Sequence, residues 1–72
     1  MNSIRNQIEG TITKITSDKV MTEVILKTPA GEVVSVITTA SAREMKLKRG
    51  KVVSAVFKAT NVSLKDCECG GH

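Results

Sequence analysis

Hydrophobic and polar residues alternate over short stretches of the chain, and Val, Ile and Thr gather in runs that turn-forming residues interrupt. Such alternation is typical of β-strands with one buried face, because successive side chains of a strand point to opposite sides. Residues 38–46 form the one stretch suited to a helix, about two turns long, which Thr38 or Thr39 would cap. The runs predict five strands, over residues 8–16, 20–27, 32–38, 52–58 and 62–65.

Glycine and proline residues mark where these strands end or bend. Pro29 and Gly31 lie between the second and third predicted strands, where Pro presets φ and Gly takes the last position of a tight turn. Residues 17–19 and the basic segment around Gly50 predict two further turns. Gly10 interrupts the alternation of the first strand and therefore predicts a bend within it.

Three strands, a short helix and two further strands follow one another, which is the order of an all-β, OB-like five-stranded barrel. Residues 1–65 would make this single domain, and residues 66–72 a disordered tail. A 72-residue chain buries only about 60% of its unfolded surface and is marginally stable alone. Apolar residues lie on both faces of the middle strands, so we expect some of them between subunits.

The charge balance indicates an anionic partner. The net charge is +4, from 11 Lys and Arg against 7 Asp and Glu, and such a surplus attracts nucleic acid, an anionic membrane or a small oxyanion. Phe57 is the only aromatic residue, so the stacking platform of single-stranded nucleic-acid binders is missing. A basic OB-like nucleic-acid-binding module remains the alternative function, and a purely structural assembly module is a third interpretation.

The residues that most enzymes require are missing or scattered. The one histidine, His72, is the final residue, so the folded body contains no histidine base. The carboxylates show no paired spacing and there is no glycine-rich phosphate loop, so we do not expect an enzyme. The sequence also shows no targeting segment at its start and no apolar run near the roughly 18 residues that cross a bilayer, so we expect a soluble cytoplasmic protein.

Hydroxyls, backbone N–H groups and fixed cations remain, and these groups hold a tetrahedral oxyanion without reacting with it. Ser3 and Arg5 alternate on an extended stretch, so both side chains would point toward one ligand. Thr38 and Ser41 lie at the start of the predicted helix, where unpaired N–H groups favour an anion. These two segments are therefore candidate binding sites.

A third candidate segment follows the fourth strand. Lys58 ends that strand beside Ala59, whose small side chain lets a ligand approach its backbone N–H. Each candidate also has a plainer interpretation. Arg5 and Lys58 are residue types that usually stay solvated, and Thr38 and Ser41 suit a helix cap that binds nothing. Capping and ligand binding are compatible with one another.

Other polar residues are interpreted structurally. Asn6 is interpreted as a turn residue and Gly10 as a backbone requirement. A cluster of four cations, most simply a solvated face, contains Lys46, Lys48, Arg49 and Lys51. In the tail, Cys67, Cys69 and His72 are weak candidate ligands for Zn or Cu(I), and we favour a disordered tail over a metal site.

Three segments resemble, in order and spacing, the successive motifs of the molbindins, which carry the molybdate-binding TOBE-type domain. They are residues 3–7 (SIRNQ) followed by Gly10, residues 37–41 (ITTAS) and residues 58–62 (KATNV). Each motif alone is weak evidence for the family, but three motifs in the same order and spacing are fairly specific. The resemblance spans about residues 2–65, nearly the whole chain.

The resemblance implies an OB-like barrel, a homo-oligomer usually described as a hexamer, and molybdate or tungstate bound between subunits for intracellular storage. It also implies that one subunit provides Ser3 and Arg5. A neighbouring subunit would provide the remaining binding groups, which are Thr38, Ser41, Lys58 and the Ala59 amide. The same groups are the candidate hydrogen-bond donors and cations singled out above.

Overall fold

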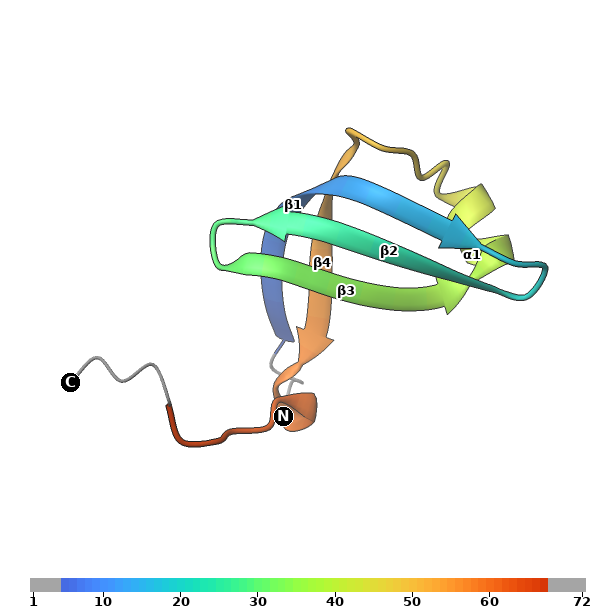
Figure 1. The fold of residues 1–72 in the computed structure, drawn as a ribbon. Helices are drawn as coiled ribbons and strands as arrows, with labels where there is room; N and C mark the ends of the chain where they lie inside the picture. The colour runs from blue at the N-terminus through green and yellow to red at the C-terminus, as the bar shows by residue number, and fades with distance from the viewer. Residues whose placement is uncertain (1–4, 68–72) are drawn as a thin grey trace.

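The computed structural model describes residues 5–67 and contains one curled antiparallel sheet with a short helix packed at one end (Figure 1). The predicted all-β class, with a single short helix between the third and fourth strands, is confirmed. In chain order the elements are β1 (Arg5–Ser17), β2 (Met21–Thr28), β3 (Gly31–Thr38), α1 (Thr39–Glu44), β4 (Val52–Lys58) and the 3₁₀ turn η1 (Ala59–Asn61).

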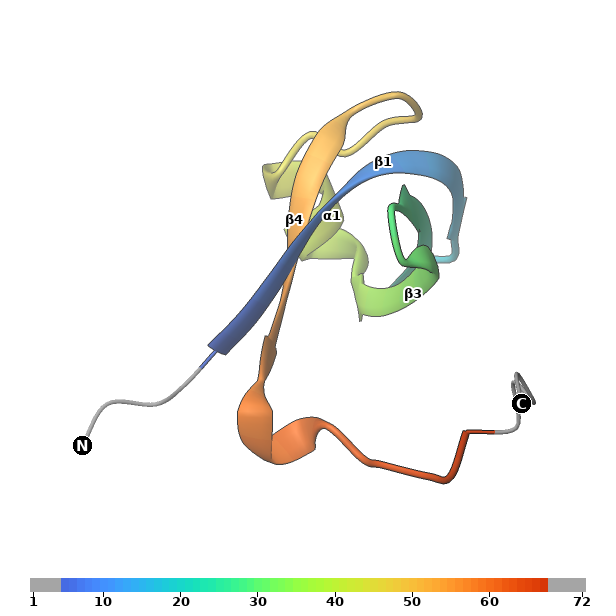
Figure 2. The ribbon, with the colours of Figure 1, turned by 90° about the vertical axis from the view of Figure 1, so that its left-hand side faces the viewer.

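The long strand β1 holds the sheet together because it pairs with two different strands. The strand order is β3-β2-β1-β4, and all pairs are antiparallel. The first half of β1 pairs with β4, and its second half, from Thr11 onward, pairs with β2. A register shift between Ile12 and Lys14 marks a bulge, which adds curvature. The result is half a barrel rather than a flat sheet (Figure 2).

Gly10 lies where β1 changes partner, and the predicted bend is confirmed there. A Cβ atom at this position would lie 2.8 Å from Cγ2 of Thr28 and 3.0 Å from the carbonyl oxygen of Lys27. The backbone of β1 therefore passes so close to the end of β2 that only glycine fits. The curve directs the first half of β1 away from the curled body, together with β4 (Figure 2).

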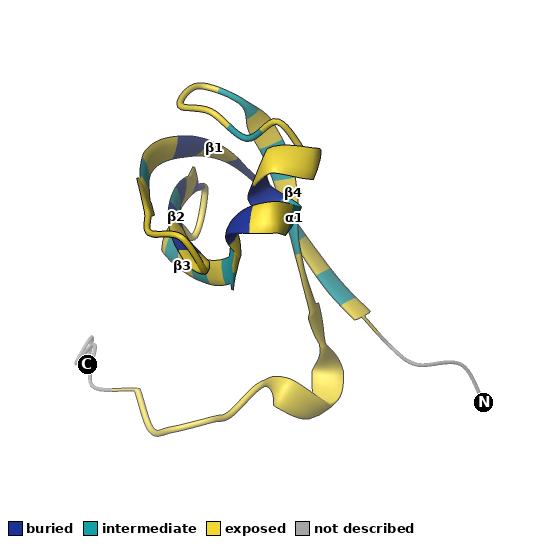
Figure 3. Cartoon of the chain, turned by 90° about the vertical axis from the view of Figure 1, so that its right-hand side faces the viewer, coloured by how far each residue is buried: buried dark blue, intermediate teal, exposed yellow. Residues whose placement is uncertain are grey.

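The core is small and lies inside the curl. Ile12, Val24 and Leu26 are its buried apolar residues, with exposures of 1%, 3% and 2%. Leu47 packs against them from beyond the helix. The first half of β1, all of β4 and the segment after it are coloured exposed or intermediate except near the curl (Figure 3). One chain thus leaves most of the β1–β4 ribbon and the segment after it exposed.

The helix α1 begins and ends with defined caps. Thr38, one of the two predicted candidates, is the N-cap, and its hydroxyl accepts a hydrogen bond from the backbone N–H of Ser41. At the other end, the N–H of Lys46 donates to the carbonyl of Arg43 and that of Leu47 to the carbonyl of Ala42. This is a Schellman arrangement, in which Lys46 takes the left-handed conformation, with φ of 54°, that glycine usually occupies.

The structure differs from the sequence prediction in several places, and the helix, predicted over residues 38–46, ends at Glu44. Residues 62–65, predicted as a fifth strand, have no regular structure, because β3 and β4 remain open edges and neither pairs with this segment. The first strand begins at Arg5 rather than at residue 8, since pairing with β4 continues to the chain's described start. Asn6 consequently lies inside β1, opposite Phe57, so its interpretation as a turn residue was wrong.

Two tight turns agree with the prediction. Gly31 and Gly50 have φ of 113° and 88°, values that favour glycine over other residues.

No helix within residues 5–67 is long and apolar enough to cross a membrane. The cytoplasmic location stays a prediction.

Candidate functional site

Two candidate cations face each other at the open end of the β1–β4 ribbon. Arg5 is the register partner of Lys58, so their side chains leave the sheet on the same face. Both residues are exposed, and neither forms an ion pair with any residue in the range 5–67. Like charges directly opposite each other destabilise a strand pair. An anion between the two side chains would remove this repulsion.

Ala59 adds a backbone donor beside this pair. It is the first residue of η1 and follows Lys58, whose backbone is extended. The first N–H groups of a helical turn, including that of Ala59, have no acceptor within the turn. The structure places Arg5, Lys58 and Ala59 at the same end of one chain, whereas the family resemblance implied that Lys58 and Ala59 of a neighbouring subunit meet Arg5. Ser3 lies outside the described residues.

Thr38 and Ser41 form a second cluster of donors at the start of α1. The Thr38 hydroxyl donates to Oγ of Ser41 over 2.8 Å, and the Ser41 N–H donates back to the Thr38 hydroxyl oxygen over 3.1 Å. Each hydroxyl carries one proton. The Thr38 proton is therefore engaged, while Ser41 keeps its own proton for an acceptor outside the chain. The plainer interpretation, a helix cap, is also correct, since both functions share these atoms.

These two clusters occupy different parts of the chain. Thr38 ends β3 next to the helix, whereas Arg5 and Lys58 lie at the far end of the β1–β4 ribbon, which extends away from the body (Figures 1 and 2). A single small anion does not reach both clusters of one subunit. If they act together, they come from two copies of the chain.

An open apolar groove separates the two clusters. The groove has a volume of about 820 Å³ and lies on the inner side of the half-barrel, between β3 and β4. Val36, Phe57 and Val62 line it and are 58%, 40% and 45% exposed. Exposed apolar residues of this size are typical of surfaces that another chain covers. The predicted apolar surplus on the middle strands is thus present.

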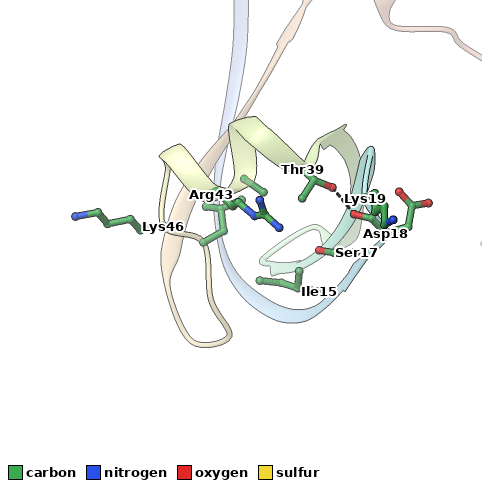
Figure 4. A pocket seen from close by; sticks show the side chains of 9 residues that line it. Ile15, Ser17, Asp18, Lys19, Thr39, Arg43 and Lys46 are labelled. Carbon is green, nitrogen blue, oxygen red and sulfur yellow. Dashed lines mark hydrogen bonds between the residues drawn. The ribbon is translucent and has the colours of Figure 1, made fainter.

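A set of hydroxyls beside the helix, two of them buried, was not singled out from the sequence as a network. Ser17, Thr22 and Thr39 form a chain of hydrogen bonds behind a pocket of about 480 Å³ at the start of α1. Figure 4 shows Thr39 pointing toward Asp18 across this pocket, with Arg43 extending over it. The available signal was Thr22, a polar residue on the apolar face of the second predicted strand.

The basic cluster after the helix is partly structural. Lys48 and Arg49 are exposed, as expected of a solvated face. Lys51 differs, because its ammonium group donates to the carbonyl of Met45 over 2.5 Å and closes the loop after α1. Hydrogen bonds from the N–H of Met21 and of Val20 hold the pKa of the Asp18 carboxyl below its ordinary value.

The tail supplies no metal site within the described residues. No group of three His, Cys, Asp or Glu residues in the range 5–67 is placed to hold a metal ion. Cys67 is exposed and its sulfur is in a disulfide, so it is not a thiolate ligand in this state. Cys69 and His72 lie outside the described residues. The disorder of residues 66–72 stays a prediction.

Comparison with known proteins assigns the family. The model of the TOBE domain matches residues 2–64, nearly the whole chain. This chain belongs to the TOBE-domain family. Two relatives from Clostridium pasteurianum support this family assignment. Molybdenum-pterin-binding protein 3 is 33% identical over 63 residues, and molybdenum-pterin-binding protein 1 is 32% identical over 63 residues. Each alignment covers 86% of this chain and 93% of the relative.

Solved structures place the TOBE-domain chain in the same fold. MopII from Clostridium pasteurianum superposes with a TM-score of 0.83 at 31% identity, covering 92% of this chain and 100% of that chain. A molybdate-binding protein from Sporomusa ovata superposes with a TM-score of 0.84 at 30% identity, covering 92% and 98%. The resemblance to molbindins and the OB-like class predicted from the sequence are therefore confirmed.

Proposed function

We propose that this TOBE-domain chain binds molybdate reversibly, without catalysing a reaction, and serves molybdate storage and homeostasis in the cytoplasm. The observation that carries the proposal is the pair Arg5 and Lys58, two cations held in register without a carboxylate partner among the described residues. A tetrahedral dianion would satisfy both charges at once. The names of the relatives, which are molybdenum-pterin-binding and molybdate-binding proteins, support molybdate as that dianion.

Each site is completed by contact between subunits. One copy contributes Arg5, with Ser3, together with Lys58 and the N–H of Ala59, which lie beside Arg5 in the same chain, while a neighbouring copy contributes the other cluster. The separation of the two clusters within one chain supports this division (Figure 1). The groups assigned to the neighbour are Thr38 and Ser41, whereas the family resemblance implied that Lys58 and the N–H of Ala59 also come from the neighbour. Tungstate has the same shape and charge as molybdate, and we expect it to occupy the same groups.

Self-association follows from the unfinished barrel, and we propose a homohexamer. The sheet has two open edges, β3 and β4, whose backbone groups are available to another chain. The apolar groove between these edges is wide and uncovered. Residues 62–67 are extended or irregular and carry Val62 and Leu64, which are 45% and 92% exposed. A second copy that covers these residues would bury the apolar surface that one chain leaves open.

A calorimetric titration tests the binding proposal. The purified protein is titrated with sodium molybdate, and with sodium tungstate, sodium sulfate and a single-stranded oligonucleotide as parallel ligands. Arg5→Ala and Lys58→Ala each remove one charge-assisted contact, so we expect each to weaken molybdate binding about 10-fold to 100-fold. The matched control is Lys14→Ala, which removes an exposed cation from the other half of β1 and should leave the affinity unchanged.

The outcomes separate the interpretations. Saturable molybdate binding that sulfate does not match, and that only the Arg5 and Lys58 variants weaken, supports the proposal. Absence of molybdate and tungstate binding to the wild-type protein refutes it. Preferential, salt-dependent oligonucleotide binding would favour a nucleic-acid module instead, which no comparison supports. Native mass spectrometry of the same sample tests the hexamer, since a monomer that binds molybdate would refute the shared site.

A further inference from the structure

A chain of hydrogen-bonded hydroxyl groups runs from the surface to the first residue of α1. Oγ of Ser17 lies 2.9 Å from Oγ1 of Thr22, which lies 2.9 Å from Oγ1 of Thr39. The Thr39 hydroxyl then donates to the carbonyl of Asp18 over 2.8 Å. Thr22 is 0% exposed and Thr39 is 5% exposed. No buried side-chain polar atom among the described residues lacks a partner, so this network is complete.

The direction of every hydrogen bond in this chain is fixed. A carbonyl oxygen only accepts, so the single proton of Thr39 goes to Asp18. The oxygen of Thr39 must therefore accept from Thr22, and the oxygen of Thr22 must accept from Ser17. A fully satisfied and directed network in a buried position specifies one geometry for the segments that it joins.

The acceptor of this network is itself held rigidly. The Asp18 carboxylate accepts from the N–H groups of Val20 and Met21 over 2.8 and 2.7 Å, which orders the turn between β1 and β2. A second bond to this turn, from the N–H of Thr39 to the carbonyl of Val20, has a length of 2.8 Å. Thr39 is thus tied by its backbone and by its side chain to one ordered turn (Figure 4).

Thr39 follows Thr38 directly and lies two residues before Ser41, the two hydroxyl residues of the proposed binding site. The helix has six residues, and helices this short do not hold their shape without tertiary contacts. The position of the Thr38 and Ser41 hydroxyls therefore depends on what fixes Thr39. We propose that Ser17, Thr22 and Thr39 are positioning residues, whose buried hydroxyl chain holds the start of α1 in the anion-binding geometry. This inference rests on the proposed function.

Paired variants at two buried threonines test the inference. Thr22→Val keeps the side-chain shape but removes the central hydroxyl, and Thr39→Val removes the donor to Asp18. We expect each to weaken molybdate binding about 10-fold, the usual effect of losing a group that orients a direct ligand. Thr39→Ser retains the hydroxyl and should restore near wild-type affinity. If Thr22→Val does not fold, the two Thr39 variants make the same comparison.

A matched control separates positioning from general loss of stability. Thr28 is also buried, and its hydroxyl donates to the carbonyl of Gly31 at the opposite end of β2, away from α1. Thr28→Val should lower the free energy of unfolding without changing molybdate affinity. Amide hydrogen exchange of Ser41 in the anion-free protein gives a second readout. It should speed up in Thr22→Val and Thr39→Val but not in Thr28→Val or Thr39→Ser.

The results distinguish this inference from the proposed function. If the wild-type protein does not bind molybdate, both fail. If the wild-type protein binds but Thr22→Val and Thr39→Val bind equally well, only the positioning inference is overturned. The same holds if Thr28→Val weakens binding as much as they do, because the loss would then reflect stability alone.

Discussion

The close passage of β1 over β2 makes Gly10→Ala a sharp test of the fold. The added methyl carbon would lie 2.8 Å from Cγ2 of Thr28, 3.0 Å from the carbonyl oxygen of Lys27 and 3.3 Å from Cβ of Leu26. Thr28 cannot rotate away easily, because its hydroxyl donates to the Gly31 carbonyl over 2.7 Å and accepts from the Ala30 N–H over 3.1 Å. One of the two strands must therefore shift.

The net cost follows from two opposing effects. Forcing a methyl group into a packed site costs about 1–3 kcal/mol. Replacing glycine by alanine also reduces the freedom of the unfolded chain, which offsets about 0.4–1 kcal/mol. We expect Gly10→Ala to lower the free energy of unfolding by about 1–2 kcal/mol. With a urea m-value of about 1 kcal/mol/M, the midpoint should fall by about 1–2 M.

A double-mutant cycle isolates the predicted contact. Thr28→Ser removes Cγ2, the nearest atom, but keeps the hydroxyl and its two hydrogen bonds. Gly10→Ala should cost clearly less in this background than in the wild-type protein, although the Lys27 carbonyl still limits the space. All variants must be compared at one protein concentration, since association adds to the apparent stability. A neutral or stabilising Gly10→Ala, or an equal cost in both backgrounds, would refute the reasoning.

Two further predictions concern Lys46, at the C-terminal end of α1, and Asp18, in the turn between β1 and β2. Lys46→Gly should raise the free energy of unfolding by about 0.5–1 kcal/mol, because Lys46 has a left-handed φ of 54° that glycine adopts without strain. Urea titration checks this prediction. The control is Lys48→Gly, which should not stabilise the fold because φ of Lys48 is not positive. Stability should also fall as the pH drops below about 4. Because the pKa of Asp18 is lower in the folded state than in the unfolded state, its carboxylate stabilises the fold at pH values above the unfolded pKa. This stabilisation is lost as the pH falls through the folded pKa. Asp18→Asn should reduce the acid dependence of unfolding measured between pH 2 and 5, and an unchanged pH profile would contradict this role of Asp18.

Local patterns predicted most of the secondary structure. The fourth strand, 52–58, has the predicted bounds, the turn at Gly31 is where the sequence placed it, and the cap is Thr38, one of the two candidate residues. Alternation, turn residues and capping residues act over a few neighbouring positions, so a single sequence contains the information. The prediction of a fifth strand over residues 62–65 was wrong, because a strand needs a pairing partner and one chain provides none for these residues.

The sequence by itself determined the strand pattern, the basic surplus and the motifs that relate the chain to its family. Only the tertiary structure decided which of the candidate residues meet. The register of β1 on β4 places Arg5 opposite Lys58, although 52 positions separate them in the sequence. The burial of Thr22 and Thr39 likewise depends on β2 packing beneath α1. Register and burial arise from contacts between distant segments, and for this reason local periodicity does not contain them.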